Sequence, residues 1–248
     1  MGSVSMMENW ARPYLAEYEQ KPHLYYAVLG DIAIDKTIQK FADNLPNGVS
    51  FRAVEVDSFR QGQEQEVLRQ FKPDLAQAVA EASSAVIVEG EISFSNDLDY
   101  LRSVVEFLTF LCDEGGQVVY DPYMMSWFSK ADWCAKADAG QLFNPFDHVT
   151  ILVSKEENGD FWYHSHGLLK FGRPDLSVHS VTSAEAPLIK IIIEKFIVFQ
   201  SLGGVIDAGR TIEVKGLSQR YSTSGLQGNR EDPNFNNYHV EIKASHES

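Results

Sequence analysis

The feature that most constrains the fold is a regular succession of strand-like and helix-like segments between residues 24 and 120. Short apolar segments with strand character alternate with segments whose apolar residues recur at helical spacing. In chain order, this pattern predicts strands at 24–29, 49–56, 84–88 and 117–120, and helices at 35–45, 61–71, 73–82 and 97–112. Such a succession is typical of an α/β or α+β sheet that is covered by helices.

The chain after residue 145 predicts a second α+β half. A Glu157–Asp160 turn joins two strands, and Thr182 and Glu185 form the pattern of a capping box at the start of a long helix. The expected elements are strands at 148–154, 161–166 and 176–181, a helix to residue 202, short strands at 205–214 and 217–222, a loop at 224–237 and a strand at 238–243. We therefore expect mixed β-sheets in two α/β halves packed together, 1–145 and 146–248, or one integrated domain.

The balance of charge narrows the classes of partner. The chain of 248 residues has 44% hydrophobic residues, which fits a folded protein, and a formal net charge of −14. Because a polyanion repels such a surface, nucleic-acid binding through a general basic face is not expected. The acidity fits ordinary solubility, and it also fits attraction to a basic partner protein.

Cysteine use and the apolar segments bear on the compartment. With Cys112 and Cys134 as its cysteines, the chain has no disulfide framework, which favours a reducing compartment. Residues 1–13 lack the basic and apolar regions of a signal peptide, and the apolar stretch at 188–199 is interrupted by charges. We expect a soluble cytoplasmic protein that does not span a membrane.

Polar, turn-forming and large apolar residues converge in residues 162–176. His164 and His166 are two residues apart, so on a strand both would point to one face and could reach one divalent metal ion. Further ligands would then be needed, with Asp175, His179 and Asp121 as candidates. The alternative is a buried histidine pair without metal, in which case no cofactor is expected.

Gly167 and Gly172 bracket a short apolar segment in the same stretch. We interpret them as the ends of a helical turn, after which Arg173 and Asp175 form a local ion pair. The alternative is a binding role, in which Arg173 and backbone N–H groups clamp an anion.

Aromatic residues gather in the middle of the chain, in a segment expected to be a loop and a short helix capped by Ser129. They form either an exposed protein-recognition surface or a cluster buried under the loop; the candidate binding residues are Tyr123, Trp127, Phe128 and Trp133.

Three acids, Glu89, Glu91 and Asp121, each follow an expected strand and would converge if the neighbouring strands were parallel.

The catalytic motifs with known mechanics are absent from the sequence. It contains no G-x-S-x-G, Walker A, G-x-G-x-x-G, paired C-x-x-C or H-E-x-x-H pattern. No catalytic residue is therefore assigned.

The segment 127–224 resembles an uncharacterised family of bacterial domains of unknown function. The resemblance rests on His166-Gly167-Leu168, Phe171-Gly172 and Asp175-Leu176, followed by the long helix and the Asp207–Ile212 turn. It implies a mixed α/β fold and no established activity. Relatives that look like immunity or defence factors give weight to a binding role, and His164 lies outside the shared pattern.

Two functions from different classes remain. The first is an acidic accessory protein without chemistry of its own, which binds a protein partner such as a toxin through an apolar patch near Tyr123–Trp133. The second is a metal-assisted hydrolase centred on His164 and His166.

Overall fold

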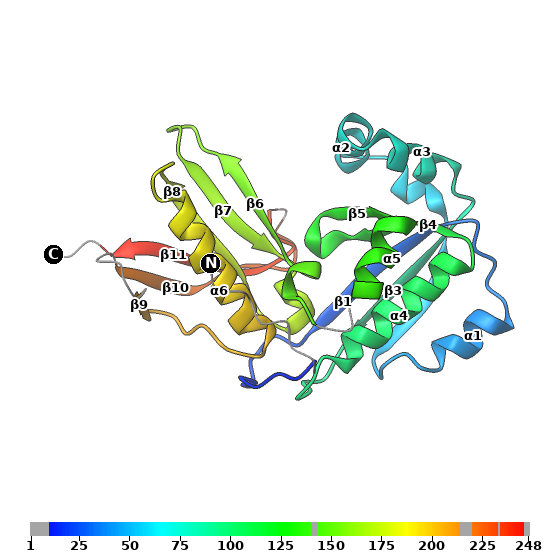
Figure 1. Cartoon of the computed structure of the whole chain (residues 1–248), viewed down its shortest axis with the longest axis horizontal. Helices are drawn as coiled ribbons and strands as arrows, with labels where there is room; N and C mark the ends of the chain where they lie inside the picture. Colours follow the sequence, from blue (N-terminus) through cyan, green and yellow to red (C-terminus); the bar gives the residue numbers. More distant parts are fainter. Residues whose placement is uncertain (1–9, 140–142, 214–219, 233, 246–248) are drawn as a thin grey trace. The chain divides into compact units, whose positions relative to one another are not determined.

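The computed structural model describes residues 10–139, 143–213, 220–232 and 234–245. The chain divides into two compact units (Figure 1). Unit 1 is built from His23–Asn144 with Trp10, and unit 2 from Ala11–Pro22 with the chain from Pro145 onward. The α+β class is confirmed, and residues 11–22 belong with the second half of the chain.

Unit 1 is built on a sheet with the strand order β2-β3-β1-β4-β5. All of its neighbouring strands are antiparallel. The strands are β1 (His23–Gly30), β2 (Val49–Val54), β3 (Ser84–Glu91), β4 (Gly116–Asp121) and β5 (Ser126–Ser129). The expected loop before the short helix thus contains a strand, β5, which pairs with β4.

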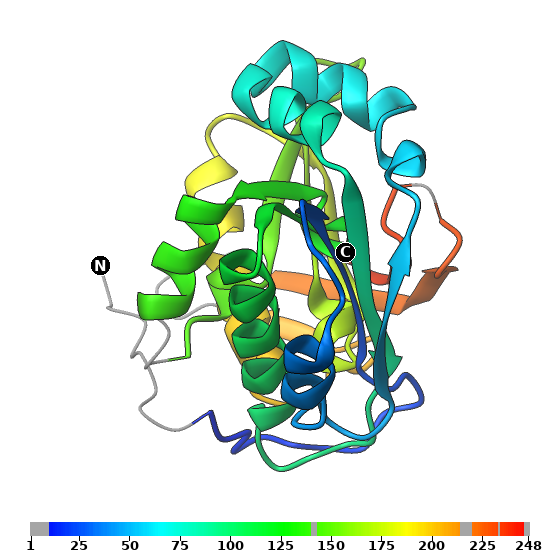
Figure 2. The same ribbon diagram turned by 90° about the vertical axis from the view of Figure 1, so that its right-hand side faces the viewer.

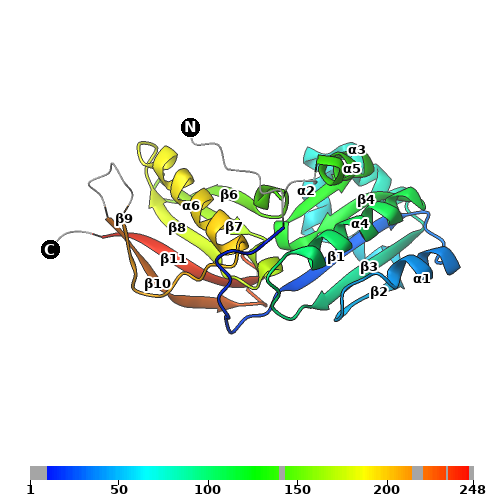
Figure 3. The ribbon, with the colours of Figure 1, turned by 60° about the horizontal axis from the view of Figure 1, so that its bottom comes forward.

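Helices cover both faces of this sheet (Figures 2 and 3). One face carries α1 (Lys36–Ala42), α4 (Asp99–Asp113) and α5 (Lys130–Ala139), and the other carries η1 (Val56–Phe59), α2 (Gln63–Phe71) and α3 (Pro73–Glu81). Asp35 caps α1 through the N–H groups of Thr37 and Ile38. Ser129 accepts a hydrogen bond from the N–H of Asp132, so its predicted capping of α5 is confirmed.

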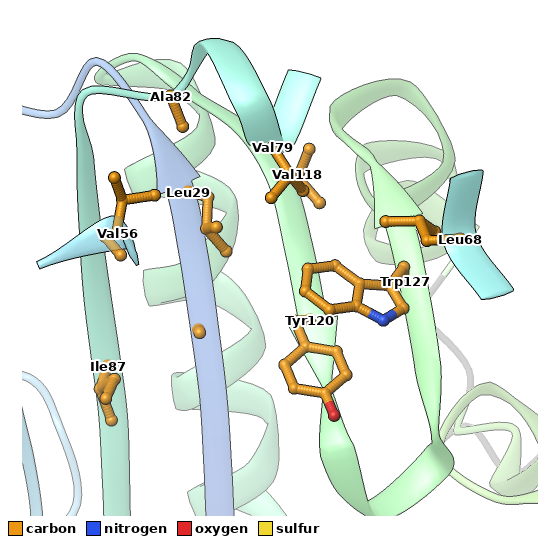
Figure 4. Close-up of a cluster of buried hydrophobic side chains, with 11 residues drawn as sticks. Leu29, Val56, Leu68, Val79, Ala82, Ile87, Val118, Tyr120 and Trp127 are labelled. Atoms are coloured by element: carbon orange, nitrogen blue, oxygen red, sulfur yellow. The ribbon is translucent and has the colours of Figure 1, made fainter. Parts of the chain in front are cut away.

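The core between the sheet and α2–α3 is apolar and aromatic (Figure 4). Trp127 stacks on Tyr120 with 4.0 Å between ring centroids. The other buried members come from the strands, η1, the two helices and the residue after α3: Ala27, Leu29, Val56, Leu68, Val79, Ala82, Ala85, Ile87 and Val118. Apolar packing therefore fixes this part of unit 1.

Unit 2 is built on a sheet with the strand order β6-β7-β8-β11-β10-β9. Strands β8 and β11 are parallel and the other neighbouring pairs are antiparallel, so this sheet is mixed as expected. Its strands are β6 (Thr150–Lys155), β7 (Phe161–His166), β8 (Asp175–Val181), β9 (Thr211–Glu213), β10 (Arg220–Asn229) and β11 (Asn237–Ser245). The prediction of a loop from residue 224 was wrong, because β10 continues to Asn229.

Helix α6 (Ala186–Ser201) packs on β7 and β8, as Figure 1 shows. The predicted capping box forms before it: the N–H and hydroxyl of Thr182 donate to the carboxylate of Glu185. The short helical turns η3 (Pro145–Asp147) and η4 (Leu168–Phe171) complete the unit. Parts of the expected strands at 205–214 and 217–222, residues 214 and 217–219, lie outside the described residues. No helix in the described segments is long and apolar enough to cross a membrane.

Candidate functional site

The two glycines of the stretch 162–176 are required by the path of the chain. Gly167 and Gly172 have φ angles of 118° and 66° and bracket η4. A Cβ at Gly167 would collide with the carbonyl oxygen of His148, and one at Gly172 would lie 2.7 Å from that of Gln20. The interpretation of this segment as a helical turn between glycines is confirmed.

Asp175 lies directly after this turn and is buried in a hydrogen-bond network. Its carboxylate accepts from the Ser165 hydroxyl at 2.8 Å, from the Leu168 N–H at 3.3 Å and from the Asn237 amide at 2.7 Å. Gln20 donates in turn to Asn237 at 2.6 Å. Burial raises the pKa of Asp175 to about 7, against the lowering effect of these donors. The network ties β7, β8, β11 and the segment 11–22 together.

Arg173 is fully buried and serves different partners. Its guanidinium donates to the carbonyl oxygens of Gly203 at 2.5 Å, Gly204 at 2.8 Å and Ala16 at 2.6 Å. The carbonyls of Gly203 and Gly204 follow the C-terminus of α6, and that of Ala16 belongs to the segment 11–22. Backbone carbonyls at a helix C-terminus lack partners within the helix and favour a cation. Because its donors point at backbone oxygens inside unit 2, Arg173 is not placed to clamp an external anion.

The side chains of His164 and His166 lie together on one face of β7, as their spacing predicted. Nδ1 of His164 and Nε2 of His166 are hydrogen-bonded at 2.7 Å, and both residues are buried. Burial lowers the pKa of His164 to about 4, with a smaller effect of His179, and that of His166 to about 3, with a smaller effect of His164. Both rings are therefore neutral at pH 7.

The outer nitrogens of this pair, Nε2 of His164 and Nδ1 of His166, have no partner in the described part of the chain. Because one ring donates to the other, one outer nitrogen carries a proton and the other a lone pair, whichever tautomers are present. Each unmet buried polar group costs about 1–3 kcal/mol.

Stacked rings surround the histidine pair. The indole of Trp162 stacks between His164, at 3.9 Å, and His179, at 4.9 Å. Phe235 stacks on His166 at 5.6 Å and on His239 at 4.1 Å. These contacts hold the loop between β10 and β11 against the face of β7.

The arrangement departs from that of a metal centre. Zn–N bonds of about 2.0–2.1 Å would place an ion between two ligating nitrogens, whereas the facing nitrogens of His164 and His166 bond to each other. The side chains of His179 and Asp175 are engaged by Glu156 and by the network above. No group of three or more His, Cys, Asp and Glu among the described residues is placed to hold a metal ion.

The aromatic segment in the middle of the chain lies mostly in the core of unit 1. Trp127 and Trp133 are buried, and the indole N–H of Trp133 donates to Thr109 at 3.2 Å. Phe128 packs edge-on to Trp133, and the hydroxyl of Tyr123 lies 2.8 Å from Nδ1 of His23. The expectation of an exposed recognition surface here was wrong for both tryptophans. Strand β5 turns Trp127 into the core beneath α2 and α3, and α5 directs Trp133 toward α4.

The acids at the strand ends, Glu89, Glu91 and Asp121, form no metal-holding group in the described part of the chain. The premise of parallel neighbours was wrong, since β1 runs antiparallel between β3 and β4. Glu89 pairs with Arg52 at 3.1 Å across the β2–β3 pair. Asp121 is buried and accepts from the N–H of Met124, so it caps the helical turn η2 (Pro122–Met124).

An exposed apolar surface occurs instead on α2, which the sequence predicted as a helix at 61–71. Phe71 is 70% exposed and Val67, one turn earlier, is 50% exposed. Gln65 of the same helix is buried, and its Nε2 has no hydrogen-bond partner among the described residues. The signal in the sequence was the pairing of Val67 and Phe71 at a spacing of four residues in a polar segment.

Comparison with protein-family models, with curated proteins and with solved structures finds no match to this chain. The resemblance of the segment 127–224 to a bacterial family therefore stays a prediction.

Proposed function

We propose that this protein is an acidic binding protein without chemistry of its own, and that α2 is the helix that contacts its protein partner. The observation that carries the proposal is the orientation of α2. The helix turns a polar residue, Gln65, toward the core and two large apolar residues, Val67 and Phe71, toward solvent.

This orientation is unfavourable in the free protein, because two apolar side chains are exposed to water and a polar one is buried. Covering Val67 and Phe71 would stabilise a complex by about 1.5–3 kcal/mol for each side chain, while the unmet amide of Gln65 destabilises the free protein. Departures from local consistency of this kind are expected at functional sites. An amphipathic helix with apolar residues at i and i+4 fits a groove on a partner protein.

The charge of the chain indicates the chemistry of that partner. The formal net charge is −14, and the Glu66 side chain on α2 is 75% exposed beside Arg69. A partner with an apolar groove and a basic rim would be attracted over a long range and held by the two apolar side chains. The resemblance of the segment 127–224 favours a partner of the immunity or defence type, such as a toxin, in the cytoplasm.

The test is affinity capture from the native host with the wild-type chain and with the double variant Val67→Ser/Phe71→Ser. We expect a basic protein to be captured by the wild type and lost with the double variant. Leu226→Ser is the matched control, since Leu226 is an exposed apolar residue on β10 and its replacement should leave capture unchanged. Capture of the same protein by all three chains would contradict the proposal.

A second variant separates binding from folding. Gln65→Met keeps the length of the side chain and removes the unmet amide, so it should raise the free energy of unfolding by about 1 kcal/mol and retain capture. Thermal unfolding, followed by circular dichroism, checks this. A lower melting temperature would show that the Gln65 amide has a partner that stabilises α2.

A further inference from the structure

The outward face of α6 in unit 2 is unusual for a helix that covers a sheet. Its inward face is formed by Ile189, Ile192, Ile193 and Ile197, which are buried. The opposite side should be polar in a helix with one covered face. Instead Ile191 is 46% exposed and Val198 is half-buried on that side, with Glu194 and Lys195 between them.

A further exposed apolar side chain, Tyr14, lies near the C-terminal end of the helix. Tyr14, which is 54% exposed, packs against Phe199 with 5.5 Å between ring centroids. The N–H of Tyr14 donates to the carbonyl of Leu202 and fixes this segment at the end of α6. Exposed apolar side chains with charged neighbours are typical of a contact surface between proteins.

The order of residues along this face is self-complementary. At 3.6 residues per turn, Ile191, Glu194, Lys195 and Val198 form one stripe. When two such stripes are placed antiparallel about an axis between residues 194 and 195, Ile191 faces Val198 of the second copy. Glu194 then faces Lys195 of the second copy, and the symmetry repeats both pairs.

We propose that the α6 stripe binds the α6 stripe of a second copy of this chain, giving a dimer with two-fold symmetry. An isologous interface requires a surface that matches itself, and this sequence provides apolar and opposite-charge pairs in one register. The net charge of −14 on each copy opposes association, so we expect the Kd of the dimer to be micromolar and not lower. This proposal uses a different unit from that of α2 and stands independently of it.

The test is sedimentation velocity with the full chain from about 1 to about 200 μM, a range that spans a micromolar Kd. We expect a mass that rises with concentration toward twice the chain's 27.9 kDa. Ile191→Asp should weaken association at least about tenfold, because a charge would enter the apolar pair. Leu226→Asp, on β10, is the control and should leave the mass unchanged.

Charge exchange tests the register itself. Glu194→Lys and Lys195→Glu should each weaken association, because like charges then face each other twice. The double variant Glu194→Lys/Lys195→Glu restores pairs of opposite charge and should recover the wild-type Kd within about threefold. A margin is left because the energy of such ion pairs depends on their surroundings. A wild-type chain that stays monomeric throughout, or a double variant no better than the single ones, would overturn the proposal.

Discussion

The two units stabilise their interiors in different ways. Beneath α2 and α3, the sheet of unit 1 is packed with aliphatic and aromatic side chains, with Trp127 stacked on Tyr120. Unit 2 also buries polar groups: Arg173, Asp175 and Asn237 lie where its strands meet α6 and the segment 11–22, and a histidine pair lies on β7. Both units are sheets covered by helices, and unit 2 adds a buried polar network to apolar contacts such as those of Ile189, Ile192 and Ile193.

The difference has a consequence for interpreting polar residues. A buried polar group is tolerated when its partners are present, and it then fixes one arrangement of the backbone. Arg173 and Asp175 join segments more than 150 and 60 positions apart through Ala16 and Asn237, respectively. Their role is therefore structural, although they stood out in the sequence as candidate binding residues.

The largest effect is expected for Arg173→Met. This change leaves the carbonyls of Gly203, Gly204 and Ala16 without their charged donor inside unit 2. The loss should be roughly 5 kcal/mol, comparable to the whole stability of a small protein. Hydrogen exchange should rise in β7 and β8 first, and Arg210→Met, at an exposed arginine paired with Asp207, should change stability by less than about 1 kcal/mol.

A smaller effect is expected from the apolar interior. Trp127→Leu removes the ring that stacks on Tyr120 and leaves a cavity, for a loss of about 2–3 kcal/mol. Urea unfolding, with hydrogen exchange in β3 and β4 as the local probe, would measure it. Phe71→Leu, at an exposed aromatic residue of the same unit, is the matched control. Equal losses from both substitutions would show that packing at Trp127 contributes nothing special.

Local patterns predicted local structure well. The capping box of Thr182 and Glu185, the turn at Gly167 and Gly172 and the shared face of His164 and His166 depend on residues close in the sequence, and all three formed. The strands and helices between residues 24 and 120 were also present in the predicted order.

Long-range pairing was what the sequence could not provide. The antiparallel order around β1 and the extension of β10 to Asn229 depend on which strands meet, since backbone hydrogen bonds to β11 stabilise a segment rich in Ser and Gly. Burial depends on the same pairing. Trp127 and Phe71 are both aromatic residues that follow a polar residue, yet β5 turns the first into the core and α2 turns the second to solvent.

The smallest effect is expected with pH, and it should fall on unit 2. In the folded chain the pKa values of His164 and His166 are about 4 and about 3, below the usual 6.5. Below pH 6.5 the unfolded chain therefore binds protons at these histidines that the folded chain does not bind. Stability from these two groups is present above pH 6.5 and is lost as the pH falls toward 4. Asp175, with its pKa raised to about 7, acts in the opposite direction, because its folded form keeps a proton that the unfolded chain releases.

The stability lost at the two histidines exceeds the stability gained at the one carboxyl group. Acidification from pH 7 to pH 4.5 should therefore lower the free energy of unfolding of the wild-type chain. Asp175→Asn removes the opposing contribution and should steepen this dependence. His166→Gln, which retains an amide nitrogen near the position of Nε2, should flatten it. Urea unfolding at several pH values measures the slopes, and hydrogen exchange in β7 against β3 locates the change. Equal slopes in all three chains would mean that the histidine pair and Asp175 titrate in the folded chain as they do in the unfolded one. The interiors of the two units would then differ in how their side chains pack and not in how their buried groups bind protons.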